Sequence, residues 1–320
     1  MMKSLKLFCF FIIFFLHSTI SFSQTITLKR VEVSKIKAKV LSEVKVYEMS
    51  SDFKKFGGIS GLKIISAKST PYPSAQFDFY FLSDDGFYLK ANPEFDKKNN
   101  LISFKIKNII PLKSEDNKTL MGDKTEGDAE AIDIKNGDIF IAFERNHRVL
   151  RYANEKKPDH FINPENFKNL ISNEGIEAMG FIKNQLILIT ENSKASPQTV
   201  KAYLYRNNVL TTFYYPLYKN YNPTDLTALN DDEILVLERS YSPNFGNRAR
   251  ILTFQYSDIK ENEIVRPKQL VKLKPPFPLD NYEAIGSIQI TEQMYKLFIV
   301  SDNNYNSKQK NLLIELNYKK

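Results

Sequence analysis

Acidic residues recur in pairs along this sequence, and each pair encloses a pattern typical of a short β-hairpin. Glu130 and Glu144 flank two apolar runs joined by the turn Lys135-Asn136-Gly137-Asp138. Asn-Gly turns favour tight hairpins, and an antiparallel hairpin brings the start of its first strand beside the end of its second. We therefore expect the two carboxylates of each pair to be neighbours. The other pairs are Glu177 with Glu191, Asp225 with Glu238, and Glu283 with Asp302.

Carboxylates gathered in this way favour cation binding. They repel one another, and burial raises their pKa values unless a cation neutralises them. An oxygen-only ligand set without His or Cys suits Ca²⁺ and, less well, Mg²⁺. Arg145 and Arg239 each directly follow an acid at the end of a hairpin, so they are candidate partners for an anionic group. The alternative is structural, with the strand-end carboxylates accepting hydrogen bonds from backbone N–H groups.

The composition excludes several other kinds of catalytic and metal site. The 320 residues include one Cys and three His, and the formal net charge is +8. Because the single Cys is Cys9, in a segment expected to be cleaved, cysteine nucleophiles and thiolate metal sites are excluded. His147 and His160 stand in loop-like contexts and are interpreted as surface histidines, so no histidine supports Ser60 as a nucleophile. The lysines are scattered and no nucleic-acid motif occurs, so no nucleic-acid partner is expected.

The N-terminal segment is predicted to be a signal peptide. Two lysines precede an apolar run over residues 7–16, and Ser21-Phe22-Ser23 supplies small residues at the cleavage positions. We predict that residues 1–23 are removed and that residues 24–320 form one exported domain, periplasmic or secreted. An uncleaved anchor is the alternative, but about ten apolar residues are too few to span a bilayer. No integral membrane segment is expected after cleavage.

The hairpin pattern recurs five times, and its spacing predicts the fold. Counted from Ser60, successive repeats begin 70, 47, 48 and 58 residues apart, close to the length of a four-stranded propeller blade. The prediction is an all-β protein, a β-propeller in which five blades are legible and six are possible. Strand-like segments before Phe53 would pair with the terminal strand from Leu312 to Leu316 and close the ring, or would form a sixth blade. A β-sandwich does not explain the repeat length.

Ordered strings spread over about residues 53–318 resemble a known family. They are Gly57-Gly-Ile-Ser-Gly-Leu62, Asp128-Ala-Glu-Ala-Ile132, Asn173-Glu-Gly-Ile-Glu-Ala178, Leu235-Val-Leu-Glu-Arg239, and Asp280-Asn-Tyr-Glu-Ala-Ile285 followed by Val300-Ser-Asp-Asn-Asn304. Together they are similar to the phytase-like domain, also described as "esterase-like activity of phytase". The resemblance implies an exported, mostly bacterial β-propeller that hydrolyses phosphate or other esters. It also implies Ca²⁺ dependence, by analogy with β-propeller phytases.

The acid pairs and the resemblance together predict a Ca²⁺-assisted phosphoric-ester hydrolase with its site at the mouth of the propeller channel. Glu177 and Glu283 are the candidate catalytic carboxylates, and Arg145 and Arg239 are the candidate phosphate-binding residues. The expected metal ligands are Glu130, Glu144, Glu191 and Asp302.

The expected partner is a small-molecule phosphate ester or other ester, although the acidic mouth does not favour the highly charged phytate itself. The alternative function is a non-catalytic binding or scaffold propeller with a structural cation. Neither the substrate nor the oligomeric state follows from the sequence.

Overall fold

The computed structural model of the protein describes residues 24–33, 40–66, 71–153 and 157–320. The predicted signal peptide, residues 1–23, lies outside the described residues. In the described part of the chain, the helices are two short 3-10 turns, η1 (Pro164–Phe167) and η2 (Tyr256–Asp258). Neither is long and apolar enough to cross a membrane. The other regular elements of the described chain are all strands, which confirms the all-β prediction.

Three of the sheets are four-stranded and antiparallel, and each is built from consecutive strands. Sequential pairing of this kind needs only short connections, as the hairpin pattern predicts. The first sheet holds β7 (Ala129–Lys135), β8 (Asp138–Phe143), β9 (Arg148–Tyr152) and β10 (Asp159–Ile162). The second holds β11 (Ile176–Ile182), β12 (Gln185–Ser196), β13 (Thr199–Arg206) and β14 (Val209–Pro216). The third holds β15 (Asn222–Ala228), β16 (Glu233–Ser242), β17 (Gly246–Gln255) and β18 (Lys268–Leu273).

The remaining strands form one nine-stranded sheet, in the order β19-β20-β21-β2-β1-β6-β5-β4-β3. Its N-terminal members are β1 (Thr25–Val31), β2 (Leu41–Ser51), β3 (Ile59–Ile65), β4 (Asp78–Ser83), β5 (Phe87–Phe95) and β6 (Leu101–Pro111). Its C-terminal members are β19 (Asn281–Thr291), β20 (Met294–Asp302) and β21 (Leu312–Lys319).

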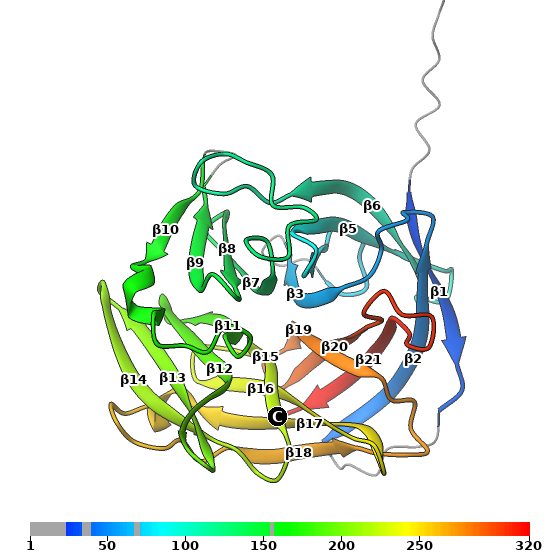
Figure 1. The fold of residues 1–320 in the computed structure, drawn as a ribbon. Coiled ribbons are helices and arrows are strands. Elements are labelled where there is room, and N and C mark those ends of the chain that lie inside the picture. Colours follow the sequence, from blue (N-terminus) through cyan, green and yellow to red (C-terminus); the bar gives the residue numbers. More distant parts are fainter. Residues whose placement is uncertain (1–23, 34–39, 67–70, 154–156) are drawn as a thin grey trace, which may run out of the picture.

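Within this large sheet, the two ends of the chain lie side by side (Figure 1). Strand β2 pairs with β21, with Val46 opposite Ile314. Strand β1 pairs with β2 along one edge and with β6 along the other. Strands β1 and β2 therefore connect the last hairpin of the chain to strands β3–β6 within the nine-stranded sheet.

Five strands face the centre of the molecule. Strand β3 contacts β7, β7 contacts β11, β11 contacts β15, β15 contacts β19, and β19 contacts β3. Figure 1 shows these strands around the centre, with their sheets extending outward. Each of the five is the first strand of a hairpin that the sequence repeats predict. The arrangement is a β-propeller-like fold.

The hairpin turns account for the local folding of the repeats. Asn136 and Gly137 both have positive φ, 54° and 88°, as a two-residue turn matched to the strand twist requires. Asn207 and Asn208 do the same, at 51° and 62°. Asparagine tolerates this left-handed region better than most residues, so these short polar turns fix the register of their hairpins.

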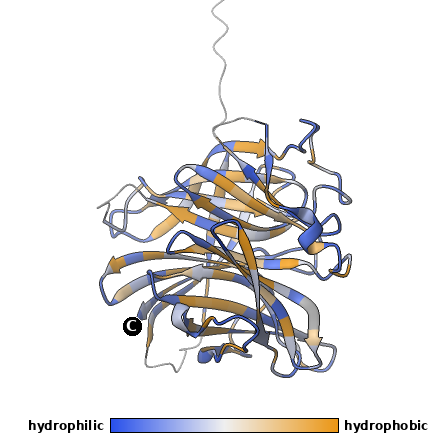
Figure 2. Ribbon diagram, turned by 90° about the vertical axis from the view of Figure 1, so that its left-hand side faces the viewer, coloured by the Kyte–Doolittle hydropathy of each residue, from blue (hydrophilic) through white to orange (hydrophobic). Residues whose placement is uncertain are grey.

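The core lies between neighbouring sheets. Ile189 of β12, Phe213 of β14 and Val236 of β16 are almost fully buried in one cluster that joins the second and third four-stranded sheets. Burial of each such side chain contributes roughly 1.5–3 kcal/mol. In Figure 2 the hydrophobic colouring follows the strands and the hydrophilic colouring gathers on the loops. Packing between the sheets therefore leaves the strand ends and loops for polar chemistry.

Candidate functional site

The same β-bulge recurs at the start of all five innermost strands. In β7, Ala129 pairs with Phe143 and Ala131 pairs with Ala142, so Glu130 between them has no partner across the hairpin. A bulge leaves one extra residue unpaired and re-aims its side chain. The five bulged residues are Ser60, Glu130, Glu177, Thr224 and Glu283.

A second set of side chains lies beside the bulges, at the end of each hairpin's second strand. Glu144, for example, directly follows Phe143, which pairs with the residue before the bulge of β7. The residues at this position are Asp84, Glu144, Glu191, Arg239 and Asp302. Four of them are acids, and Arg239 in the β15–β16 hairpin is the exception.

These strand ends enclose a cavity of about 310 Å³, which we call the acidic cavity. Among its described lining residues, seven are carboxylates and one is an arginine. The carboxylates are Asp84, Glu130, Glu144, Glu177, Glu191, Glu283 and Asp302, and the arginine is Arg239. So large an excess of negative charge in a small volume is stable only with bound protons or a bound cation.

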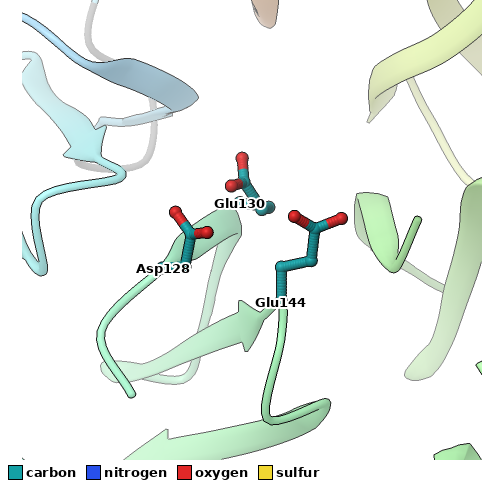
Figure 3. A group of neighbouring side chains, drawn as sticks. All are labelled: Asp128, Glu130 and Glu144. Atoms are coloured by element: carbon teal, nitrogen blue, oxygen red, sulfur yellow. The ribbon is translucent and has the colours of Figure 1, made fainter. Parts of the chain in front are cut away.

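One part of this site has the geometry of a metal centre. Asp128, Glu130 and Glu144 each place a carboxylate oxygen within 4.8 Å of the other two. Figure 3 shows the three side chains at one end of the β7–β8 hairpin. Oxygen donors at this spacing, some of them buried, fit a hard divalent cation. The group could therefore hold a metal ion.

Burial and mutual repulsion raise the pKa values of the central acids. Burial raises the pKa of Glu130 well above its ordinary value, and the nearby carboxylate of Glu177 adds to the effect. Burial likewise raises the pKa of Glu177, reinforced by Glu191 and Glu144 and opposed by the Arg239 guanidinium. The pKa of Glu144 is raised by burial too, although the Gly175 amide, which donates to its Oε1 at 2.9 Å, acts in the other direction.

Arg239 is the cationic counterpart within the acidic cavity. Its Nη2 lies 3.2 Å from Oε1 of Glu283. Burial nevertheless raises the pKa of Glu283 to about 7, because the attraction to Arg239 only partly offsets the loss of hydration. Burial also raises the pKa of Asp302 to about 6, although the Ile59 amide donates to its Oδ1 at 3.1 Å.

Two further cations lie at the rim. Nε of Arg145 is 2.6 Å from Oδ2 of Asp128, and Nζ of Lys124 is 3.3 Å from Oδ1 of the same carboxylate. Lys124 also pairs with Asp84. The other oxygen of Asp84, Oδ1, is buried and has no hydrogen-bond partner among the described residues. This oxygen is an available ligand for a cation.

The structure brings together most of the residues that the sequence singled out. The acidic cavity is lined by the predicted catalytic residues Glu177 and Glu283, by the predicted metal ligands Glu130, Glu144, Glu191 and Asp302, and by Arg239. Arg145 is not among its lining residues, because its guanidinium is held by Asp128 and is partly exposed.

The predicted placement of Asp225 and Glu238 at the channel mouth is wrong. The bulge in β15 falls at Thr224, so Asp225 lies one residue further along the strand. Its side chain reaches the neighbouring innermost strand, β19. Its Oδ2 accepts a hydrogen bond from the Ile285 amide at 2.8 Å. Glu238 is fully buried, forms an ion pair with Arg250, and accepts a hydrogen bond from the Tyr215 hydroxyl at 2.8 Å.

Several polar residues of the site were not expected from the sequence. Asp128 belongs to the metal-like group, Lys124 bridges two acids, and Asn173, Asn281 and Asn304 line the acidic cavity. A weak signal exists for part of this set. Asp128 and Asn281 each lie two residues before a bulged glutamate, at the point where the chain enters an innermost strand.

A comparison with protein families identifies one match. A family model described as "Phytase-like: Esterase-like activity of phytase" matches residues 54–305, well over half of the chain. Among curated proteins, none matches the chain significantly.

Similar solved structures include a protein of unknown function from Dyadobacter fermentans DSM 18053. It is 12% identical, with a TM-score of 0.42 over 93% of this chain and 98% of that one. YCF48 bound to D1 peptide is 7% identical, with a TM-score of 0.37 over 92% and 95%. Trypanosoma rangeli sialidase in complex with the inhibitor DANA is 4% identical, with a TM-score of 0.36 over 90% and 55%. With TM-scores below 0.5, these likenesses carry no argument about this chain.

Proposed function

The chain belongs to the phytase-like family, and we propose that it is an exported, metal-assisted hydrolase of phosphoric esters that acts in the acidic cavity. The observation that carries the proposal is the concentration of seven carboxylates and one arginine around a single cavity of about 310 Å³. A binding surface for a neutral ligand has no need of so many buried and half-buried acids, since removing each from water costs desolvation energy.

We propose Ca²⁺ as the cation and the group of Asp128, Glu130 and Glu144 as its main ligands, with Glu191 and Asp302 as further candidates. The all-oxygen donor set and the unpartnered Oδ1 of Asp84 support a hard cation. When bound, such an ion would neutralise the acids and attract the phosphate oxygens of a substrate.

Arg239 is the residue that we propose to bind the phosphate. Its guanidinium lines the acidic cavity, and its Nε is buried with no hydrogen-bond partner among the described residues. A guanidinium can donate two parallel hydrogen bonds to a phosphate group. Because Arg145 does not line the acidic cavity, we assign it instead to holding Asp128 in place.

Glu177 and Glu283 are the carboxylates that we propose to handle protons. The pKa of Glu283, about 7, allows it to accept a proton from the attacking water near neutral pH. The raised pKa of Glu177 suits a group that donates a proton to the oxygen of the leaving alcohol. In the overall step, the water oxygen forms a bond to phosphorus, the phosphorus–oxygen bond to the alcohol breaks, and the alcohol leaves protonated.

The finer description of the fold belongs to the same proposal. We propose that the protein is a five-bladed β-propeller in which β2 closes the ring by supplying the outer strand of the last blade. The contacts among the five innermost strands and the pairing of Val46 with Ile314 support this description. Export through a signal peptide over residues 1–23 is proposed from the sequence.

A non-catalytic binding propeller with a structural cation is the second candidate. One observation favours it. Glu144 accepts a hydrogen bond from the Gly175 amide, and Asp302 accepts one from the Ile59 amide. Both acids therefore also hold the backbone where neighbouring hairpins meet. In that case the cation would stabilise the ring without turnover.

The test is hydrolysis of a panel of phosphate monoesters, phytate and carboxyl esters by the mature protein, with Ca²⁺ and with EDTA. Parallel assays use Glu177→Gln, Glu283→Gln and the control Glu165→Gln, which changes an exposed acid in η1. Ca²⁺-dependent turnover that survives in the control and is lost in the other two folded variants supports the hydrolase. Absence of turnover, together with a melting temperature that rises with Ca²⁺, overturns it in favour of the binding propeller.

A further inference from the structure

A second hollow lies beside the acidic cavity and shares two of its walls. This side pocket has a volume of about 440 Å³, and both Glu191 and Arg239 line it as well as the acidic cavity. Its other walls come from Pro197 in the β12–β13 turn, from the segment between β14 and β15, from the start of β15 and from the last residues of β16. The two hollows therefore adjoin at Glu191 and Arg239.

Arg239, which lines both hollows, has a donor group that could bind an oxygen atom of a ligand. One side of its guanidinium is bonded to Glu283. Its Nε is buried and has no hydrogen-bond partner among the residues that the structure describes. A buried donor without a partner costs about 1–3 kcal/mol, and an acceptor on a bound ligand would remove this cost.

The walls of the side pocket combine hydrogen-bonding groups with an aromatic ring. Asn220 and Ser240 contribute polar side chains, and within the described chain neither side chain forms a hydrogen bond. Tyr241 adds an aromatic ring that is 61% exposed. Asn222 differs, because its Nδ2 donates to Oε1 of Glu191 at 3.2 Å and so fixes the shared wall.

This combination matches the chemistry of a sugar. A sugar ring carries hydroxyl groups around its edge, which amide and hydroxyl side chains can bind, and apolar C–H faces, which an aromatic ring can cover. The volume of the side pocket is within the usual range for small-molecule sites, roughly 300–1,000 Å³. Lys219 is the one cation among its described lining residues apart from the shared Arg239, so the walls do not favour several phosphates.

We propose that the side pocket binds the sugar portion of a singly phosphorylated sugar, whose phosphate lies in the acidic cavity against Arg239. The proposal rests on the proposed phosphoric-ester chemistry for the placement of the phosphate, and it adds the substrate class and the residues that select it. Tyr241 and Asn220 are specificity-determining residues, which contact the sugar and not the reacting phosphorus.

The test is calorimetric binding of glucose 1-phosphate and of its non-hydrolysable methylene phosphonate analogue, with Ca²⁺ present, to the mature protein and two variants. Tyr241→Ala removes the aromatic wall. Phe245→Ala is the matched control, because Phe245 is 63% exposed on the same β16–β17 hairpin and is not among the lining residues. We expect Tyr241→Ala to weaken binding of both ligands roughly three- to tenfold and Phe245→Ala to leave it unchanged.

Equal affinity in the wild type and Tyr241→Ala would overturn the proposal, as would failure of the wild type to bind either ligand. The outcome is separable from that of the hydrolase, because the phosphonate measures binding without turnover. A Tyr241 effect on phosphonate binding without hydrolysis of any ester supports the sugar site while the hydrolase fails. Hydrolysis of glucose 1-phosphate with an unchanged KM in Tyr241→Ala supports the hydrolase while the sugar site fails.

Discussion

Nη2 of Arg239 lies 3.2 Å from Oε1 of Glu283, and the two residues come from neighbouring hairpins at adjoining positions of the repeat. Arg239 stands where the other four hairpins carry an acid. The single reversal of charge gives the acidic cavity one side that can attract an anion, while the rest of its lining attracts a cation. This asymmetry within the repeat supports the proposed phosphate-binding role of Arg239.

Replacing Arg239 with Glu should convert the site into a stronger cation site that no longer binds phosphate. The added acid increases the negative potential, whereas the loss of the guanidinium removes the donors for the phosphate oxygens. We expect a Ca²⁺ midpoint at lower concentration in thermal melts and a fall of at least about 100-fold in kcat/KM for phosphate esters. Arg151→Glu, at an exposed arginine paired with Asp159, is the control. Retained turnover in Arg239→Glu would contradict the assignment.

Replacing Glu130 with Gln should remove most of the stabilisation by Ca²⁺. At a concentration about 100 times the dissociation constant, a ligand adds about 2.7 kcal/mol, equivalent to roughly 4 °C in melting temperature for a chain of this size. Glu130→Gln keeps the shape of the side chain but removes a charged ligand from the metal-like group. Asp138→Asn, at the opposite end of the same hairpin, should behave like the wild type. Equal Ca²⁺ shifts in both variants would exclude Glu130 as a ligand.

In the absence of a divalent cation, Glu283 should make the free energy of unfolding higher at pH 5.5 than at pH 7.5. The pKa of Glu283 in the folded protein is about 7, above the ordinary value of a glutamate, so the folded protein binds this proton more tightly than the unfolded chain. The stabilisation that protonated Glu283 gives to the folded protein is therefore present at low pH and is lost as the pH rises through about 7. Melting in EDTA should show a flatter pH dependence for Glu283→Gln. The same pH dependence of melting in the wild type and in Glu283→Gln would contradict the raised pKa of Glu283.

Asp225→Ala should destabilise the fold without changing the response to Ca²⁺. The Asp225 carboxylate accepts hydrogen bonds from the backbone amides of Leu226, at 2.7 Å, and Ile285, at 2.8 Å. The substitution leaves both buried donors unpaired. At about 1–3 kcal/mol for each of the two donors, the free energy of unfolding should fall by roughly 2–6 kcal/mol. Urea denaturation measures this loss. A changed Ca²⁺ midpoint would mean that Asp225 reaches the cavity after all.

The sequence alone determined the repeated hairpins and the end of each hairpin at which the acids gather. Alternating and apolar runs, Asn-rich turns and a repeat of 47 to 70 residues are local features, and strand geometry places the first and last residues of a hairpin side by side. For this reason the order of residues along the chain is enough to pair Glu130 with Glu144, Glu177 with Glu191, and Glu283 with Asp302.

Tertiary structure decided which of those acids face the centre and what each one meets there. A bulge shifts the register by one residue, and in the fourth hairpin this shift puts Thr224 at the repeated position and leaves Asp225 between blades. The approach of Arg239 to Glu283, the holding of Arg145 by Asp128 and the raised pKa values all depend on neighbouring hairpins packing around one centre. Desolvation and charge pairing act through space, so the order of residues along the chain does not contain them.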